Sequence, residues 1–425
     1  MGRPLLPRDG VPRRSPACHV ITLPLDTNIG RIEHCSCITF SEPSQEEHDD
    51  HSGHHHRRRP RRAHLARVLH TLDIPATVYD SDASPDARTQ GGQLDLHEED
   101  GQRSLEIAGL TEQYRAIIHR GGGARRILDT HGNLLVELAD DGSMTRPETL
   151  RGDIRRILLD SLPDETVQWG KKFVGATALG PGRHEVRFAD GSTTISEILV
   201  GAEGTWSKVR SLLSDEQPVY AGMSYIDTCL HDVDEQHPTA AATVGEGALY
   251  ALIPGQGFLT HREPGDTIHT YVILNRPLDW FVDLDFADVD ATKTRLAAEF
   301  EGWAPELVAL ITDADAPTLR SIYELPSSHR WDRVPGVTLI GDAAHVTVPG
   351  GDGANLAMFD GAQLAQAIAA HPDDLETALT AYEQAMFPRS EAAAVAAHQT
   401  VSLIFGDGAP AGLLKVFSGL AARHS

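Results

Sequence analysis

The sequence predicts an α/β fold in which a nucleotide-binding domain is interrupted by a β-rich domain and followed by a C-terminal helix. Three observations support this fold class. Residues 63–80 place a helical apolar stripe before a short β-branched strand that ends in an acid. Residues 194–213 and 337–368 each combine a strand, a glycine turn and a helix. Residues 220–325 contain alternating apolar runs typical of antiparallel strands.

The first unit begins with a helix over "AHLARVLHTL", residues 63–72, and continues into the strand "ATVYD". The apolar stripe of the helix consists of Leu65, Val68, Leu69 and Leu72. Asp80 ends the strand, and an acid at this place is what a dinucleotide-binding unit uses to bond a ribose. A further helix is predicted to begin near Thr149 or Arg151, and "LETALTAYEQAMF" opens the C-terminal helical region.

Composition limits the classes of function. The chain has 425 residues and a net charge of -24, which argues against general binding to nucleic acid or to an anionic membrane. The sequence contains no run of about 18 apolar residues, so it predicts no membrane-spanning helix. The four cysteines, Cys18, Cys35, Cys37 and Cys229, form no disulfide framework. We therefore expect a cytoplasmic protein, and we expect it to be a monomer. We expect no metal site, since one residue between Cys35 and Cys37 is not a zinc-ligand spacing.

The segment "LIGDAAH" followed by "PGGDGAN" carries the strongest chemical signal. A buried strand delivers Gly341 and Asp342 to its carboxyl end, the edge at which open α/β sheets bind ligands. The helix that follows has free N–H groups at its first turn, which suit a pyrophosphate or an electron-rich ring. The alternative is a tight strand-to-helix turn in which the aspartate only caps the helix.

These motifs resemble those of a known family. "LIGDAAH" with "GANLAM" resembles the second flavin-contacting motif of class A flavin monooxygenases, which have the para-hydroxybenzoate hydroxylase fold. "LVGAEGTWSKVR" resembles the middle motif of that family, with Glu203-Gly204 in place of the usual Asp-Gly. Residues 78–97 and 145–162 are similar to the tetracycline-inactivating branch, and the resemblance covers residues 63–425.

The resemblance implies FAD and NADPH as cofactors and assigns roles to several residues. Asp80 would hold the adenosine ribose, Arg88 would meet NADPH, Asp95 and Arg151 would contact FAD, and Asp342 would bind the ribityl chain. The flavin-facing turns would comprise Gly341, Gly351, Gly353, Ala354 and Asn355. Relatives carry a Pro-Pro-Phe-Ala-Gly turn where this chain has "VTVPGGDG", a departure that allows a rebuilt turn. For Arg88 and Arg151 the alternative is a solvated surface arginine.

Under this resemblance the chain divides into five segments. They are an irregular or out-of-frame segment (1–53), the first part of a Rossmann-like FAD-binding domain (54–219), an inserted β-rich substrate domain (220–329), the second part of the FAD-binding domain (330–370) and a C-terminal helical region (371–425).

The function implied is an NAD(P)H-consuming, FAD-dependent monooxygenase that uses molecular oxygen, through a flavin C4a-hydroperoxide, to hydroxylate an aromatic or polyketide-type small molecule. A tetracycline-like antibiotic is one candidate substrate. No catalytic residue is assigned, because His261, His269 and His345 could equally be structural groups or proton carriers. The alternatives are a flavin oxidoreductase without oxygen insertion and a flavin-deficient ligand-binding protein.

The basic run "HHHRRRPRRAH", residues 54–64, lies where the glycine-rich phosphate loop of this family belongs. Read as protein, it could be a metal cluster, a nucleic-acid patch or a solvated stretch. Read one base later with permitted codons, it becomes Thr-Ile-Ile-Gly-Ala-Gly-Pro-Ala-Gly-Leu-Thr, a strand running into G-x-G-x-x-G. Its last glycine falls at Arg62, 18 residues before Asp80, close to the expected spacing of roughly 20.

We therefore hypothesise that the sequence before about residue 64 is out of frame, through a frameshift or a sequencing error, and resequencing the gene tests this. As printed, the chain lacks the small residues that let the backbone approach a pyrophosphate, which predicts impaired FAD binding.

Overall fold

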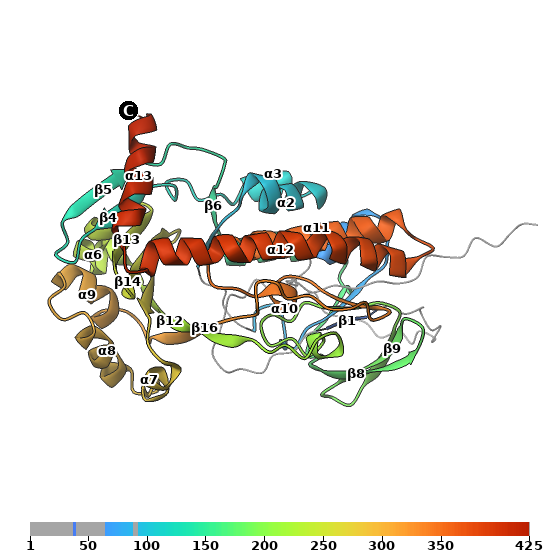
Figure 1. Ribbon diagram of the computed structural model, residues 1–425. Coiled ribbons are helices and arrows are strands. Elements are labelled where there is room, and N and C mark those ends of the chain that lie inside the picture. The colour runs from blue at the N-terminus through green and yellow to red at the C-terminus, as the bar shows by residue number, and fades with distance from the viewer. Residues whose placement is uncertain (1–36, 40–63, 88–91, 425) are drawn as a thin grey trace, which may run out of the picture.

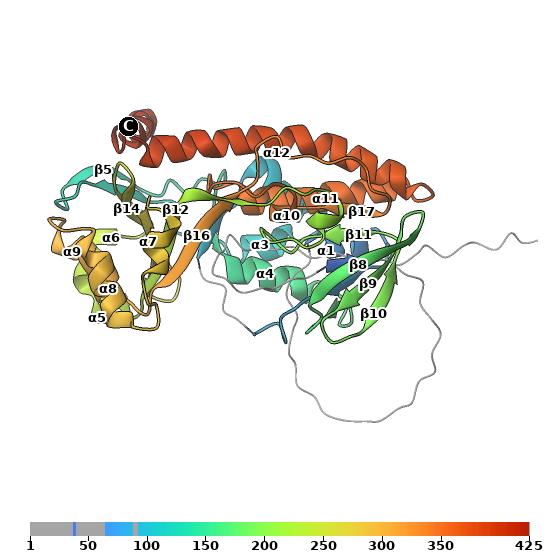
Figure 2. The same ribbon diagram turned by 60° about the horizontal axis from the view of Figure 1, so that its bottom comes forward.

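The computed structural model describes residues 37–39, 64–87 and 92–424, and it consists of two units joined side by side (Figure 1). The long helix α12, Leu375–Phe405, extends across both units, as Figure 2 shows from a second direction. It is followed by α13, Ala411–His424, which confirms the predicted C-terminal helical region. None of the helices among the described residues has the length and apolar character of a membrane span.

The first unit contains a five-stranded sheet in the order β17-β11-β1-β2-β7. Its strands are β1 (Cys37–Thr39), β2 (Thr77–Tyr79), β7 (Val167–Gln168), β11 (Leu199–Gly201) and β17 (Val337–Leu339). The pairs β11–β17 and β2–β7 are parallel, as in a nucleotide-binding sheet, whereas β1 is antiparallel to both of its neighbours. This strand lies within residues 1–53, for which the sequence predicted no regular structure.

The predicted helix of the first unit is confirmed as α1, His64–Thr71, which packs on α11, Gly353–Ala370. Leu65, Val68 and Leu69 are buried, whereas Leu72 lies beyond the helix and is 40% exposed, so its place in the apolar stripe was wrong. Gly361 allows the two helices to approach, because a Cβ there would lie 3.0 Å from the Cβ of Leu65.

The other elements of the first unit surround this sheet. They are β3 (Gln93–Asp95), the π-helical turn Glu98–Gln102, α2 (Arg103–Ile107), α3 (Thr111–Arg115), β6 (Glu148–Leu150), α4 (Arg151–Asp160), β8 (Phe173–Gly180), β9 (Arg183–Phe188), β10 (Thr193–Ser196) and α10 (Asp342–His345). The predicted helix start near residue 149 or 151 is confirmed at Arg151.

One helix prediction in this unit was wrong. Residues 194–213 contain the predicted strand and turn, but the helix is reduced to a 3-10 turn at Arg210–Leu212. Side chains satisfy the backbone here, because Glu203 accepts a hydrogen bond from the Val209 N–H and Arg210 donates to the Thr205 carbonyl. These bonds replace those that a helix would form between backbone groups.

The second unit contains a seven-stranded sheet in the order β16-β12-β15-β14-β13-β4-β5. Its strands are β4 (Arg125–Leu128), β5 (Leu134–Leu138), β12 (Val219–Leu230), β13 (Ala248–Ile253), β14 (Gln256–Glu263), β15 (Thr267–Leu274) and β16 (Thr318–Glu324). All neighbours pair antiparallel except β13 and β4. The β-rich character of residues 220–325 is thus confirmed, and β4 and β5 join this sheet from before residue 220.

The two faces of the seven-stranded sheet have different neighbours. One face packs its apolar side chains, such as Phe258 and Val272, against Phe300 and Leu307 in a helical layer. That layer consists of α5 (Val233–Gln236), α6 (Pro238–Val244), α7 (Leu278–Val282), α8 (Val289–Ala298) and α9 (Pro305–Thr312). The opposite face is directed toward the first unit and α12. It carries apolar residues such as Ile127 and Ile273, which cluster with Phe405 of α12, and also His261, His269 and Tyr271.

Candidate functional site

Two of the predicted binding residues stand at the carboxyl ends of strands in the first sheet. Asp80 follows β2 and is fully buried, and its carboxylate accepts a hydrogen bond from the Asp82 N–H over 2.9 Å. Gly341 follows β17 with a φ of +57°, and a Cβ at this position would lie 2.9 Å from that of Ala357. Only glycine fits both the dihedral angle and this space, so the turn before Asp342 depends on it.

A buried ion cluster fixes the turn at Gly341. The Gly341 N–H donates to the Asp360 carboxylate over 2.9 Å, and the same carboxylate contacts His345 at 2.6 Å and Arg389 at 2.7 Å. Burial disfavours charge on both His345 and Asp360, but their mutual attraction outweighs it, so the pKa of His345 is raised and that of Asp360 is lowered. His345 is therefore a positioning group here.

A second cluster joins β3 to the start of α11. The Asn355 amide donates to the Asp95 carbonyl over 3.0 Å and accepts from the His97 N–H over 3.1 Å. The His97 ring lies 3.3 Å from the Asp95 carboxylate and 3.2 Å from that of Asp352. Burial opposes the charge on His97, yet Asp95 outweighs it and raises the pKa of His97 above its usual value. The predicted residues Asp95 and Asn355 are thus brought together.

The amino end of α11 is open toward an approaching group. Asp352 precedes this 18-residue helix without forming a side-chain cap, so the first N–H groups have no such acceptor. Gly351 has a φ of +100°, and a Cβ at either Gly351 or Gly353 would meet no atom within 4 Å. Ala354 is buried behind them. This surface of small residues and helix N–H groups fits an electron-rich, planar group such as the flavin ring of FAD.

The middle motif is bonded directly to the turn after β17. The buried Arg210 guanidinium donates to the Ala343 carbonyl over 3.0 Å and to the Thr205 carbonyl over 2.6 Å. Burial lowers the pKa of Arg210 to about 10, and burial also raises the pKa of the nearby Glu203 carboxyl. Glu203 accepts from the Val209 N–H over 2.8 Å, so the longer arm of glutamate is used to hold its own loop.

The two units meet at Gly92, which is the first described residue after the gap at 88–91. Gly92 has a φ of +86°, and a Cβ there would lie 2.8 Å from the Tyr271 hydroxyl, 3.3 Å from the His269 ring and 3.5 Å from the Arg151 Nε. The backbone N–H of Arg151 donates to the Gly92 carbonyl over 3.1 Å. Arg151 is therefore at the boundary between the units, whereas Arg88 lies outside the described residues.

A buried ion pair that the sequence did not indicate also crosses this boundary. Arg125, on β4 of the second sheet, bonds Glu148, on β6 of the first unit, over 2.8 Å. Burial raises the pKa of Glu148 to about 7, although Arg125 opposes this shift. No local signal in the sequence pairs these residues, because β4 enters the second sheet only through its contact with β13.

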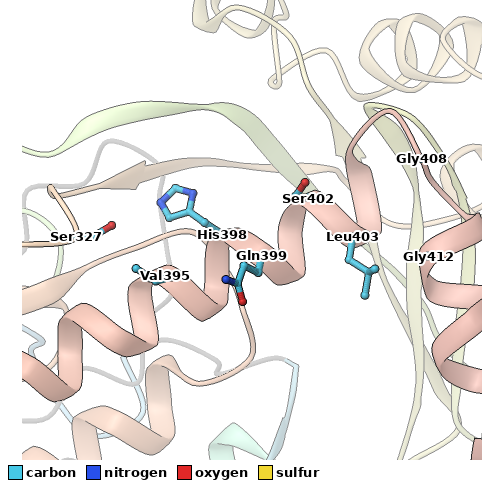
Figure 3. A pocket seen from close by; sticks show the side chains of 8 residues that line it. All are labelled: Ser327, Val395, His398, Gln399, Ser402, Leu403, Gly408 and Gly412. Carbon is cyan, nitrogen blue, oxygen red and sulfur yellow. The ribbon is translucent and has the colours of Figure 1, made fainter.

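A separate hollow of about 610 Å³ is lined by His398, Gln399 and Leu403 of α12 and by Gly408 of the loop that leads to α13 (Figure 3). None of the predicted binding residues lines this hollow. The candidate site is therefore the region between the carboxyl ends of the first sheet, the start of α11 and the facing side of the second sheet.

Comparisons with known proteins agree with this arrangement. The FAD binding domain family matches residues 290–397. A monooxygenase of Emericella nidulans, asqM, is 27% identical over 407 residues, which cover 80% of this chain and 91% of that protein. Among solved structures, Klebsiella pneumoniae HpxO complexed with FAD and uric acid aligns with a TM-score of 0.67 at 20% identity, covering 84% of this chain and 89% of HpxO. Tetracycline destructase Tet(55) aligns with a TM-score of 0.65 at 18% identity, covering 81% and 87% respectively.

The protein therefore has the fold of the class A FAD-dependent monooxygenases, as its motifs predict. The expectation of an FAD-dependent monooxygenase is confirmed by the match to the FAD binding domain and by the monooxygenase relatives.

Proposed function

We propose that this protein uses NAD(P)H and molecular oxygen to hydroxylate an aromatic or polyketide-type small molecule. The main support is the boundary at Gly92, where the start of β3 meets Tyr271 and His269 of the second sheet. A substrate bound on this side of the sheet would lie next to the elements that fit a flavin. The tetracycline destructase fold makes a tetracycline-like antibiotic one candidate substrate.

The described residues can perform the binding part of this reaction. Asp80 would hold the adenosine ribose, Asp342 the ribityl chain, and Asp95 and Arg151 would contact the flavin. Gly351, Gly353, Ala354 and Asn355 would form the surface under its ring. When bound and reduced by NAD(P)H, FAD would supply the activation of oxygen, and the protein would orient the substrate and exclude water.

The test is oxygen uptake by the purified full-length chain with NADPH or NADH and tetracycline or simple phenols as substrates. We expect substrate-dependent oxygen consumption and a product that carries one atom from labelled molecular oxygen. Turnover without oxygen insertion would instead identify a flavin oxidoreductase.

A pair of glycine variants tests the location of the site. Gly92 and Gly142 both have positive φ values, of 86° and 68°, but only at Gly92 would an added Cβ have neighbours within 4 Å. Gly92→Val should therefore reduce turnover sharply, whereas Gly142→Val should retain it. Equal activity of the two variants would place the site elsewhere.

A second candidate function is favoured by the sequence of residues 54–64. Arg57, Arg59 and Arg62 occupy the positions at which a phosphate loop would carry glycine, so the printed chain could be a flavin-deficient ligand-binding protein. A purified protein that remains colourless after FAD is added would support this second function.

A further inference from the structure

Three histidines were candidates for proton carriers, and the structure separates them. His345 is engaged by Asp360 at 2.6 Å. His269 is buried between Glu263, 3.1 Å from its Nδ1, and Asp227, 3.5 Å from its Nε2. Both ring nitrogens of His269 thus face carboxylates. Burial disfavours its charge, but Tyr271, Asp227 and Glu263 outweigh burial and raise its pKa well above the usual value. His269 therefore has no ring nitrogen left for a ligand, and the Nε2 of His345 is occupied by Asp360.

His261 differs from both. It lies on β14, in register with Ala248 of β13 and His269 of β15, and its side chain is half-buried. Its ring stands edge-on to Tyr271 with 6.4 Å between the ring centroids, on the side of the sheet that meets Gly92. No hydrogen bond or ion pair engages the His261 ring among the residues that the structure describes.

Three basic groups, Arg125, Arg151 and His269, outweigh the acid Asp95 in their effect on His261, although His269 is itself paired with Glu263 and Asp227. Burial, together with the nearby Arg125, His269 and Arg151, lowers the pKa of His261 to about 3, while Asp95 acts in the opposite sense. Glu148 only partly offsets Arg125 near neutral pH, because its own pKa is raised to about 7. His261 is therefore a neutral imidazole with one N–H donor and one acceptor, in a region that favours negative charge.

Aromatic side chains complete this surface. Tyr225 and Tyr271 lie on the same side of the sheet with 5.6 Å between their ring centroids, and Tyr250 is on the neighbouring part of the same side. Flat rings beside a donor and several cations suit a planar ligand that carries an acidic oxygen.

We infer that His261 is a substrate-binding residue that donates its ring N–H to an acidic oxygen, a phenolic or enolic hydroxyl in its ionised form, on a planar substrate. This inference rests on the proposed function and adds the substrate class. The cations contributed by Arg125, Arg151 and His269 stabilise the negative charge of that oxygen, and His261 fixes its position. A substrate whose hydroxyl is methylated or absent loses both interactions.

The experiment uses the full-length protein and alizarin, a planar dihydroxyanthraquinone whose visible band shifts when a phenolic proton is lost. Difference spectra against ligand-free protein report both binding and ionisation. We expect the wild-type protein to bind alizarin in its ionised form at a lower pH than free alizarin ionises. His261→Leu should weaken binding about tenfold, the equivalent of one hydrogen bond to a charged group, and should lose the spectral shift.

Three comparisons make the result decisive. His131 is an exposed histidine in the turn between β4 and β5, so His131→Leu should bind alizarin as the wild type does. His261→Gln retains an N–H donor and should restore most of the binding. Anthraquinone, which has no hydroxyl, should bind wild type and His261→Leu equally weakly.

Equal alizarin binding by wild type and His261→Leu, or no alizarin binding by the wild type, would overturn the inference. The outcome is separable from the proposed function, because binding requires no turnover. A protein that ionises alizarin through His261 but consumes no oxygen would refute the monooxygenase activity and retain this binding site.

Discussion

The Asn355 amide donates a hydrogen bond to the backbone carbonyl of Asp95 over 3.0 Å, although 260 residues separate the two in the chain. The same side chain accepts from the His97 N–H, so one asparagine joins the start of α11 to the strand β3. Both elements contain residues predicted to contact the flavin. The relative position of these contacts therefore depends on a single fully buried side chain.

Asn355→Ala should destabilise the protein and weaken FAD binding. The substitution leaves the His97 N–H and the Asp95 carbonyl without partners in a buried region, which costs about 2 to 4 kcal/mol. Urea unfolding and titration with FAD measure the two effects. The control is Asn133→Ala in an exposed turn, where the lost contact to Asp129 should cost less than about 0.5 kcal/mol. Similar losses in the two variants would contradict the role of Asn355.

The His345–Asp360 pair predicts a specific pH dependence of stability. The pKa of His345 is raised in the folded state, so its contribution is fully present below 6.5 and is lost as the pH rises through the raised value. The pKa of Asp360 is lowered, so its contribution is present above 3.8 and is lost as the pH falls through the lowered value.

The difference in unfolding free energy between wild type and His345→Gln should therefore be largest between these two limits and should shrink as the pH rises above 6.5. Urea unfolding across this pH range measures it. His131→Gln, at an exposed position, should show no such trend. A difference that grows with increasing pH would have the wrong sign for this pair.

Arg210→Met should loosen the turn that carries Gly341 and Asp342. The variant removes the hydrogen bonds to the Ala343 and Thr205 carbonyls and leaves the buried Glu203 without its nearby cation. Loss of a buried charge partner costs about 3 to 5 kcal/mol. Thermal and urea unfolding should show this loss, and Arg210→Lys should recover part of it.

The control for this prediction is Arg103→Met. Arg103 is 55% exposed and, in the part of the chain that the structure describes, pairs only with Glu106, which is 60% exposed, so its removal should cost less than about 1 kcal/mol. If Arg210→Met were as stable as Arg103→Met, the bonds from Arg210 to the loop would have no structural importance.

Elements defined by local patterns could be predicted from the sequence. The apolar spacing of α1, the start of α4 at Arg151 and the strand, turn and helix around Gly341 all follow from periodicity and glycine placement. The helix expected after Glu203 failed because side-chain bonds from Glu203 and Arg210 satisfy the backbone instead. The spacing of apolar residues in the sequence does not indicate such side-chain hydrogen bonds.

Contacts between distant segments could not be predicted. Strand β4 joins the second sheet by pairing with β13, more than 100 residues later, and this pairing brings Arg125 to the boundary between the units. His269 has carboxylate partners, whereas His261 has none among the described residues. This difference depends on how the strands pair, and the sequence of a single strand does not determine that register. The sequence named both histidines as candidates but could not distinguish them.

The direction of β1 bears on the hypothesis that the chain before about residue 64 is out of frame. In a nucleotide-binding unit the strand before the first helix runs parallel to its neighbours, but Cys37–Thr39 is antiparallel to both β11 and β2. His64 begins α1 fully buried, its Nδ1 has no hydrogen-bond partner among the described residues, and burial lowers its pKa to about 4. The shifted reading frame places threonine at position 64, and this smaller side chain would take the place of the buried imidazole.

Replacing residues 54–64 by Thr-Ile-Ile-Gly-Ala-Gly-Pro-Ala-Gly-Leu-Thr should therefore increase FAD affinity by about tenfold or more, since each backbone hydrogen bond gained by a phosphate contributes on the order of 1.5 kcal/mol. The visible absorption of flavin that remains bound after gel filtration measures the effect. The matched control replaces the three glycines of this segment by alanine, which removes the basic run but blocks close approach of the backbone to a pyrophosphate. Tight FAD binding by the printed chain, or by the alanine control as well, would show that a glycine-rich loop is not what limits flavin binding in this protein.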